Sequence, residues 1–386
     1  MSIYDVIPIT VADYRRRARR RLPRFLFDYA EGGANDELTL AANVSAFQRL
    51  RLKQRVMRDV SGVDTATELL GRTASLPLAL APVGMAGMFA RRAEVQAARA
   101  AEQAGIPFTA STVGICSLEE ISNATQGPFW FQLYMLRDRE FVSGLLERAA
   151  NAGCKTLVFT VDLPVAGLRL RDFRNGLLGG GLPGKLSKFT QLASSPAWAW
   201  DVGFRGRPHS FGNLSDKVAN PEDLEAYKAF VDAQFDPSCT WEDIHWLRDQ
   251  WPGKLLIKGV MEAEDARAAV DAGADGVVVS NHGGRQLDAV AGSASKVQAV
   301  AGAIGGQAEV YVDGGVRSGL DIVKAVALGA RGVLIGRPWV FAVAARGQQG
   351  VEDLLDLFRR EVATAMALMG VNRIADIDAR VLDNSG

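Results

Sequence analysis

An alternation of short apolar segments with amphipathic ones constrains the fold of this chain more than any other feature. From residue 77 onward, each segment rich in aliphatic and β-branched residues precedes a helix-like segment or a gap long enough for one. The apolar segments are continuous, which is typical of strands buried on both faces of a parallel sheet. The predicted strands are 77–82, 107–112, 130–134, 156–162, 254–259, 276–281, 309–315 and 332–338.

Eight such strands with their helices predict an α/β fold, a (β/α)8 TIM barrel. A doubly wound sheet is the alternative, but it would carry a glycine-rich phosphate loop after the first strand, and none is found there. We expect one domain over residues 1–386, with an N-terminal helical segment and a barrel core at about 77–370. The predicted core helices are 94–105, 137–153, 263–273, 294–304, 318–330 and 351–368.

A long insertion interrupts the repeat after the fourth strand, at about residues 165–240. It is rich in Gly, Pro, Ser and Trp and has little periodicity, so we expect a functional loop. Its aromatic residues are interleaved with Lys and Arg, which suits either a lipid interface or a lid packed on the barrel or on a partner subunit. These aromatic residues are Trp198, Trp200, Phe204 and Phe211.

A cluster of arginines lies near the N-terminus, in the segment YRRRARRRLPR. Two explanations are open: a solvated helix face, or contact with an anionic membrane surface, where each Arg is worth about 1 kcal/mol. The arginines are Arg15, Arg16, Arg17, Arg19, Arg20, Arg21 and Arg24.

The charge balance and the cysteines exclude several classes of protein. Lys plus Arg and Asp plus Glu number 44 each, so no net charge attracts nucleic acid. The 3 cysteines lack metal-ligand spacing, and their odd number fits a reducing cytosol better than a disulfide framework. No apolar segment reaches the roughly 18 residues that span a bilayer, and the first residues do not resemble a signal peptide. We therefore expect a cytoplasmic protein with no metal site.

Polar and glycine residues gather at the predicted C-terminal ends of the strands, where barrels of this class carry their active sites. Because nearly every strand contributes one, we expect a single site at that rim. The residues at these strand ends, most of them polar or glycine, are in chain order Ala81, Pro82, Val83, Gly84, Ser111, Thr112, Gln132, Tyr134, Thr160, Asp162, Arg169, Lys258, His282, Arg285, Asp313, Gly314, Gly315, Arg317, Gly336 and Arg337.

The last two strand ends, DGGVRSG and IGRP, each combine glycine with an arginine. Glycine lets backbone N–H groups approach a phosphate, and Arg supplies bidentate charge. Phosphate binding after the seventh and eighth strands recurs in this fold. These loops predict a phosphate-bearing ligand, held around Gly315, Arg317, Gly336 and Arg337.

The stretch SNHGGRQLD places His282 at the end of the sixth strand. A carboxylate such as Asp162 would raise the pKa of its imidazole and fix the tautomer, as suits a general base. Arg169 and Arg285 form a natural clamp for a substrate carboxylate, which predicts a small hydroxy or keto acid. Lys258 ends an apolar strand, so it serves either as a Schiff-base amine or as a cation against a cofactor ring. The pattern alone does not choose between these two roles.

Several motifs in these positions resemble the FMN-dependent L-2-hydroxy-acid dehydrogenases and oxidases, over about residues 10–375. SNHGGRQLD is the most specific, supported by FDYAEGGANDELTL, WFQLY, TVDLP, IKGV, DGGVRSGLDIVKAVALGA and IGRP. APVGMAGMFARRAE and AWAWDVGFRGRPHSFGN resemble most closely the branch of bacterial respiratory, quinone-linked L-lactate dehydrogenases.

The resemblance implies a role for each residue at the rim. His282 would be the catalytic base, Asp162 would stabilise its protonated form, and Lys258 would face the reduced flavin. The substrate would contact Tyr29, Tyr134, Arg169 and Arg285. FMN would contact Ala81, Pro82, Val83, Ser111, Gln132, Thr160, Lys258, Asp313, Gly315, Arg317, Gly336 and Arg337.

The implied activity is oxidation of an L-2-hydroxy acid, first L-lactate to pyruvate and second a mandelate-like acid. The insertion resembles the segment that brings such dehydrogenases to a membrane, so the implied electron acceptor is a quinone. The implied location is the cytoplasmic face of the bacterial inner membrane, where the protein would bind peripherally. The implied oligomeric state is a homotetramer. Two positions, Val113 and Gly84, differ from tryptophan and alanine in related oxidases, which puts the substrate size and access of oxygen in doubt.

Three other functions remain open from the residues alone. An oxygen-using oxidase would release peroxide. A phosphate-site isomerase or lyase would use Lys258 as a Schiff base and would be colourless. A membrane-associated binding module would have a degenerate site, against which the intact set of polar residues argues.

Overall fold

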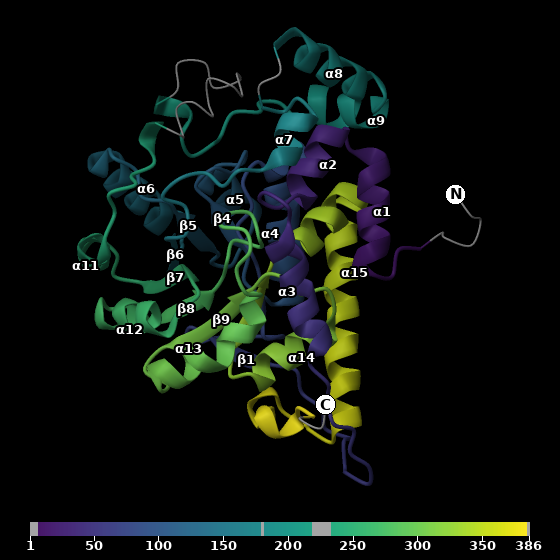
Figure 1. The fold of residues 1–386 in the computed structure, drawn as a ribbon, viewed down its shortest axis with the longest axis vertical. Coiled ribbons are helices and arrows are strands. Elements are labelled where there is room, and N and C mark those ends of the chain that lie inside the picture. Colours follow the sequence, from purple (N-terminus) through teal and green to yellow (C-terminus); the bar gives the residue numbers. More distant parts are fainter. Residues whose placement is uncertain (1–6, 179–180, 218–232, 384–386) are drawn as a thin grey trace.

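The computed structural model describes residues 7–178, 181–217 and 233–383. Its centre is a sheet of eight parallel strands in the order β3-β10-β9-β8-β7-β6-β5-β4 (Figure 1), and a parallel bridge between Leu80 and Phe108 joins its two edges. The predicted barrel is therefore confirmed. The strands are β3 Leu78–Leu80, β4 Thr109–Ser111, β5 Trp130–Leu133, β6 Thr156–Thr160, β7 Lys254–Val260, β8 Gly276–Val279, β9 Glu309–Asp313 and β10 Gly332–Ile335.

A helix follows every strand, and the helices surround the barrel. They are α4 Ala93–Ala104, α5 Leu118–Ala124, α6 Arg139–Asn151, α11 Trp241–Gln250, α12 Ala263–Asp271, α13 Val297–Ile304, α14 Gly319–Ala327 and α15 Arg337–Met369. The helix predicted near 351–368 forms the second part of α15, but the prediction missed a first helical part, which meets the second at a kink at Arg346 and Gly347. The first is buried on all sides from Pro338 to Ala344, so it lacks the polar face that marks a helix in sequence.

Three N-terminal helices, α1 Val11–Arg21, α2 Arg24–Glu31 and α3 Leu38–Arg49, pack against α15 and the rim of the barrel (Figure 1). In α1, the residues Val11, Tyr14 and Ala18 are buried on one face. The arginines lie on the other faces, and several pair with carboxylates, as Arg15 does with Glu31 and Arg21 with Asp201. A solvated, ion-paired helix face therefore accounts for much of the arginine cluster.

The insertion after β6 is not the loop that we predicted. It forms the helices α7 Leu170–Arg174, α8 Gly181–Ala193 and α9 Pro196–Trp198 and the π-helix η2 Ala199–Phe204. Gly181, Pro183 and Gly184 lie in the first turn of α8, where glycine and proline interrupt a helix least, so composition hid it. Figure 1 shows α8 and α9 beside α1 and α2, at one end of the molecule. Residues 218–232 of the predicted insertion lie outside the described residues.

The four aromatic residues of the insertion divide into two pairs. Trp198 and Phe211 are both buried, and the indole N–H of Trp198 donates to the Met88 carbonyl at 2.8 Å. A lipid interface is therefore wrong for these two, because the barrel already covers them. Trp200 and Phe204 are 60% and 62% exposed, and their rings stack at 5.2 Å.

Short elements complete the chain. The antiparallel strands β1 Thr67–Leu69 and β2 Arg72–Ala74 form a hairpin, and five 3-10 segments span Ala86–Met88, Ser215–Lys217, Ser293–Lys296, Ile374–Asp376 and Ala379–Val381. Within the described ranges, no helix has the length and the apolar character needed to span a bilayer.

Inward-facing side chains fill the barrel below the rim. Trp130 and Tyr311 meet edge to face there, with ring centroids 6.0 Å apart. Leu69 and Leu70 of the β1–β2 hairpin belong to the same buried cluster, so the hairpin closes the end of the barrel opposite the rim. This end is built for packing and leaves the rim free for chemistry.

We expect Trp130→Ala to lower the free energy of unfolding by about 3–5 kcal/mol, because it leaves a cavity inside the barrel. Trp200→Ala is the matched control, since its exposed ring should change stability by no more than about 0.5 kcal/mol. Urea denaturation followed by circular dichroism measures both variants. Equal losses in the two would contradict the assignment of Trp130 to the barrel interior.

Candidate active site

A cavity of about 560 Å³ opens at the C-terminal ends of the strands. Its walls bring together residues from both ends of the chain and include most of the predicted site. Those predicted residues are Tyr29, Ala81, Pro82, Val83, Tyr134, Thr160, Arg169, Lys258, His282, Arg285, Asp313, Gly315, Arg317, Gly336 and Arg337. Asp162, Ser111 and Gln132 do not line the cavity but lie next to its wall: Asp162 contacts His282, and Ser111 accepts from the Val113 N–H and donates to Gln132.

His282 and Asp162 form the central contact of the cavity. The imidazole Nδ1 lies 2.7 Å from Asp162 Oδ1, which leaves Nε2 available for a ligand. Burial favours the neutral form of Asp162, but the charges of His282 and Lys258 outweigh it and hold the pKa of this carboxyl below its usual value. Asp162 is therefore ionised at neutral pH and can stabilise a protonated imidazole. Gly259, with φ +112°, allows this approach, because a Cβ there would lie 2.6 Å from that of Asp162.

Ser280 connects His282 to Lys258. Its hydroxyl accepts hydrogen bonds from the His282 backbone N–H and from Lys258 Nζ, both at 3.0 Å. Lys258 Nζ also lies 3.0 Å from Asp313 Oδ2. Burial lowers the pKa of Lys258, but the negative charges of Asp313 and Asp162 have the larger combined effect and raise it above its ordinary value. A Schiff-base nucleophile must be a neutral amine, so this environment favours the cationic role.

Two side chains of SNHGGRQLD that received no role from sequence reasoning fix the loops of the rim. Gln286 Nε2 donates to the carbonyls of Asp162 and Val165, at 2.8 and 2.9 Å. Asp288 accepts hydrogen bonds from the backbone N–H groups of Asp36, Leu38 and Thr39 (3.0, 3.3 and 2.8 Å), at the start of α3. The only signal for them in the sequence was membership of the motif.

Asn281 joins the same loop to α3. It exchanges two amide hydrogen bonds with Asn43, at 2.8 and 2.9 Å, in a buried position. The Asn43 side chain also accepts from the Ser293 N–H, and a Cβ on Gly315 would lie 2.1 Å from the Asn43 carbonyl oxygen. The histidine loop and the glycine loop after β9 therefore share one support, Asn43, which sequence reasoning did not identify.

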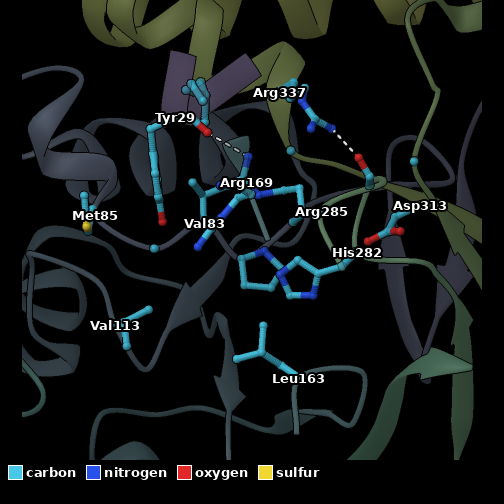
Figure 2. A pocket seen from close by; sticks show the side chains of 18 of the residues that line it. Tyr29, Val83, Met85, Val113, Leu163, Arg169, His282, Arg285, Asp313 and Arg337 are labelled. Atoms are coloured by element: carbon cyan, nitrogen blue, oxygen red, sulfur yellow. Dashed lines mark hydrogen bonds between the residues drawn. The ribbon is translucent and has the colours of Figure 1, made fainter. Parts of the chain in front are cut away.

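Arg169 and Arg285, the two arginines predicted to bind a carboxylate, both approach the Tyr29 ring. Their guanidinium carbons are 5.2 and 4.9 Å from its centroid. Arg285 donates to the carbonyls of Tyr29 and Gly32, at 2.7 and 2.8 Å. Burial lowers the pKa of Arg285, and the charge of Arg169 adds to the effect. Figure 2 shows Tyr29, Arg169, Arg285 and His282 pointing into one space, so α2 does fold over the rim as the role of Tyr29 requires.

Arg317 and Arg337 bring two further buried positive charges to the wall of the cavity. Arg337 donates to the carbonyls of Glu31, Gly283 and Gly32, at 3.0, 2.9 and 2.8 Å. Burial, then Arg285 and Arg317, depress the pKa of Arg337 well below its ordinary value. Burial lowers the pKa of Arg317 to about 10. Two buried guanidinium groups beside glycine-rich loops suit an anionic ligand, such as the phosphate predicted from the sequence.

Several buried polar atoms at the cavity have no hydrogen-bond partner among the described residues. They include Gln132 Nε2, Thr160 Oγ1 and Asp313 Oδ1. Buried polar groups are nearly always paired in native proteins, so these atoms indicate a ligand with several polar edges. Ser111 donates to Gln132 Oε1 at 3.1 Å and so orients the free amide.

The apolar wall of the cavity includes Val113, Leu163 and Gly84. A Cβ on Gly84 would lie 2.8 Å from Val113 Cγ2 and 3.9 Å from the Tyr29 hydroxyl. Small and aliphatic residues therefore border the space beside Tyr29. Within the described ranges, no group of three metal-ligating side chains occurs.

A family model described as FMN-dependent dehydrogenase matches residues 18–384. The chain belongs to the FMN-dependent dehydrogenases. FMN, with its phosphate and its polar ring, fits the two arginines and the unpaired Gln132, Thr160 and Asp313 atoms described above. The family resemblance and the FMN cofactor expected from the sequence are thereby confirmed.

Curated relatives of this FMN-dependent dehydrogenase are named L-lactate dehydrogenase, and solved structures similar to it are a mandelate dehydrogenase and a mandelate oxidase. The chain is 54% identical to an L-lactate dehydrogenase of Caulobacter sp. (strain K31), over 97% of this chain and 98% of that protein. An L-lactate dehydrogenase of Stenotrophomonas maltophilia (strain R551-3) is 52% identical, over 96% and 98%. The solved structure of monotopic membrane protein (S)-mandelate dehydrogenase has a TM-score of 0.92 at 37% identity, covering 98% of this chain and 100% of that one. A mandelate oxidase with (S)-4-hydroxymandelic acid has a TM-score of 0.84 at 40% identity, over 97% and 98%.

We expect Asp288→Ala to destabilise the protein by about 1–2 kcal/mol at pH 7, because it removes the acceptor of three N–H groups at the start of α3. Those hydrogen bonds lower the pKa of Asp288 although burial raises it, so its contribution is present above the unfolded pKa, near 3.9, and is lost as the pH falls through the folded value. The difference between wild type and variant should therefore shrink below about pH 4. Urea unfolding at several pH values measures it, with exposed Asp36→Ala as the control; a penalty independent of pH would contradict this role.

Proposed function

We propose that this enzyme oxidises L-lactate to pyruvate and passes the electrons through FMN to a quinone. The observation that carries the proposal is the His282–Asp162 contact of 2.7 Å in the same cavity as two arginines. The names of the curated relatives support lactate as the first substrate.

The substrate carboxylate would bind between Arg169 and Arg285. Tyr29 and Tyr134 stand at the same end of the cavity and would donate hydroxyl hydrogen bonds. Burial raises the pKa of the Tyr134 hydroxyl far above its ordinary value, and Asp162 and Tyr29 add to the rise, so Tyr134 remains a donor at any physiological pH. The arginines supply the charge, and the tyrosines fix the orientation.

His282 would act as the general base, taking a proton from the substrate at Nε2. Asp162 holds Nδ1 and stabilises the imidazolium that forms, as a buried carboxylate does for a catalytic histidine. When bound, FMN supplies the acceptor for the two electrons that leave the hydroxy acid. Lys258, Ser111, Gln132, Thr160, Asp313 and the backbone of Ala81, Pro82 and Val83 would hold its ring and ribityl chain. Gly315, Arg317, Gly336 and Arg337 would hold its phosphate.

A mandelate-type substrate is the second candidate. It is favoured by the two mandelate enzymes among the structural neighbours and by the small residues Val113 and Gly84 at the apolar wall. Initial rates with L-lactate and (S)-mandelate decide between them. The yield of hydrogen peroxide per turnover separates a quinone-linked dehydrogenase from an oxygen-using oxidase.

The surface that would reach the membrane lies on α8 and η2. Leu182, Leu186 and Phe189 of α8 are 82%, 65% and 69% exposed, and Trp200 and Phe204 extend the apolar set. The exposed arginines of α1 and α2 lie beside this end of the molecule, where they would meet anionic headgroups. A monotopic membrane protein among the neighbours supports peripheral binding, which we place at the cytoplasmic face of the bacterial inner membrane. A homotetramer is proposed on the family resemblance alone.

We expect His282→Gln to slow the reduction of bound FMN by L-lactate by about 10²–10⁴-fold, because the general base is lost. Anaerobic stopped-flow absorbance measures the rate, and the visible spectrum checks that FMN stays bound. The exposed His245→Gln on α11 is the control and should keep the wild-type rate. Rapid reduction in His282→Gln would remove this histidine from the mechanism.

We expect the double substitution Trp200→Ser, Phe204→Ser to weaken binding to vesicles of anionic phospholipid by at least about tenfold, since both rings leave the interface. Co-sedimentation with the vesicles measures the affinity. Met57→Ser, which alters a residue 99% exposed elsewhere on the surface, is the control. Unchanged sedimentation of the double variant would exclude η2 from the membrane contact.

A further inference from the structure

Asp172 is a buried carboxylate at the substrate end of the cavity for which the mechanism gives no task. It belongs to α7, lines the same cavity as Arg169 and Arg285, and is 1% exposed. Its Oδ2 lies 3.5 Å from Arg169 Nε and has no hydrogen-bond partner among the described residues. A buried charge is costly unless it compensates another, so its position beside the two arginines calls for an electrostatic explanation.

The two arginines are held in different ways. Arg285 is anchored by the carbonyl oxygens of Tyr29 and Gly32, which orient it without neutralising it. Arg169 has Asp172 as its ion-pair partner and stacks on the Tyr29 ring. Asp172 also acts electrostatically on Arg285, so one carboxylate serves two guanidinium groups. With Asp172 ionised, the Arg169–Arg285 pair and Asp172 together carry one net positive charge, which one substrate carboxylate balances.

We propose that Asp172 is a specificity residue that matches the arginine pair to a single carboxylate and so selects monocarboxylate 2-hydroxy acids over dicarboxylates. The inference rests on the proposed function, in which Arg169 and Arg285 bind the substrate carboxylate. A dicarboxylate would bring a second negative charge to an arginine pair whose one net positive charge the first carboxylate already balances. Charges interact strongly where they are buried, so the mismatch disfavours the dicarboxylate.

The neighbours of Asp172 shift the pKa of its carboxyl group, and so affect whether it is charged. Burial raises the pKa of this carboxyl above its ordinary value; Arg169 and Arg285 act in the opposite direction, and Asp28 adds to the rise. Selectivity is therefore best measured at pH 8, because a high pH favours the ionised form of a carboxyl whose pKa is raised and keeps the dicarboxylate ionised. Asp172→Asn removes the charge but keeps the shape and an oxygen facing Arg169, which separates charge selection from mere support of α7.

D-lactate and D-malate are suitable probes, because they share the configuration at C2 and differ by one carboxylate. Their dissociation constants are measured on the FMN-loaded enzyme at pH 8 from the change in flavin absorbance, and competition with L-lactate confirms the site. Wild type should bind D-lactate more tightly than D-malate. In Asp172→Asn, the affinity for D-malate relative to D-lactate should rise about tenfold, since a unit charge is removed within a few ångströms.

Two further variants complete the test. Asp172→Glu keeps the charge and should keep the wild-type ratio. Asp36→Asn is the control: it removes an exposed carboxylate that does not line the cavity, and should change the ratio less than twofold. If Asp172→Asn does not fold, Asp172→Ser supplies the neutral side chain.

The outcomes separate this inference from the proposed function. An unchanged ratio in a folded neutral variant, with both anions bound competitively, overturns the role of Asp172 alone. Failure of both anions to compete with L-lactate in wild type overturns the arginine clamp itself, and the inference with it.

Discussion

The contact between His282 and Asp162 depends on backbone positions fixed by residues far away in the chain, and the site depends on that contact. His282 has φ +57°, a left-handed conformation that is costly for a residue with a side chain. Ser280 holds its N–H, and Asn281 is locked to Asn43 of α3. These hydrogen bonds hold the backbone of His282 in its strained conformation. The N-terminal helices are therefore part of the active site, although they lie outside the barrel.

The cavity wall carries several buried charges. Arg317 and Arg337 have depressed pKa values, and the phosphate of FMN would balance their charge. Lys258 lies between Asp313 and the Asp162–His282 pair and remains cationic. Arg285 neighbours Arg337, since both donate to the Gly32 carbonyl, and Asp172 offsets one of the two charges of the Arg169–Arg285 pair. Each group of charges is thereby suited to one part of the cofactor or the substrate.

The barrel and its rim could be predicted because a parallel barrel converts chain order into spatial order. Once continuous apolar strands were recognised, the residues after them had to meet at one rim, and His282, Asp162 and Arg337 do line or adjoin one cavity. The partners of the motif residues could not be predicted in this way. Asp288 contacts Thr39, and Asn281 contacts Asn43, more than two hundred positions away, through side chains without a periodic signal.

The insertion shows the opposite limit, because local composition misled the prediction. Glycine and proline at the start of α8 concealed a helix. Trp198 is buried and donates a hydrogen bond to the Met88 carbonyl, and no local sequence pattern predicts this contact.

The central claim is that residues gathered at the rim present a hydroxy acid to FMN. Anaerobic titration of the purified yellow enzyme with L-lactate tests it most directly. The account predicts that the flavin absorbance bleaches with one pyruvate formed per FMN and that D-lactate leaves it unchanged; a colourless protein, or a flavin that L-lactate does not reduce, would contradict it.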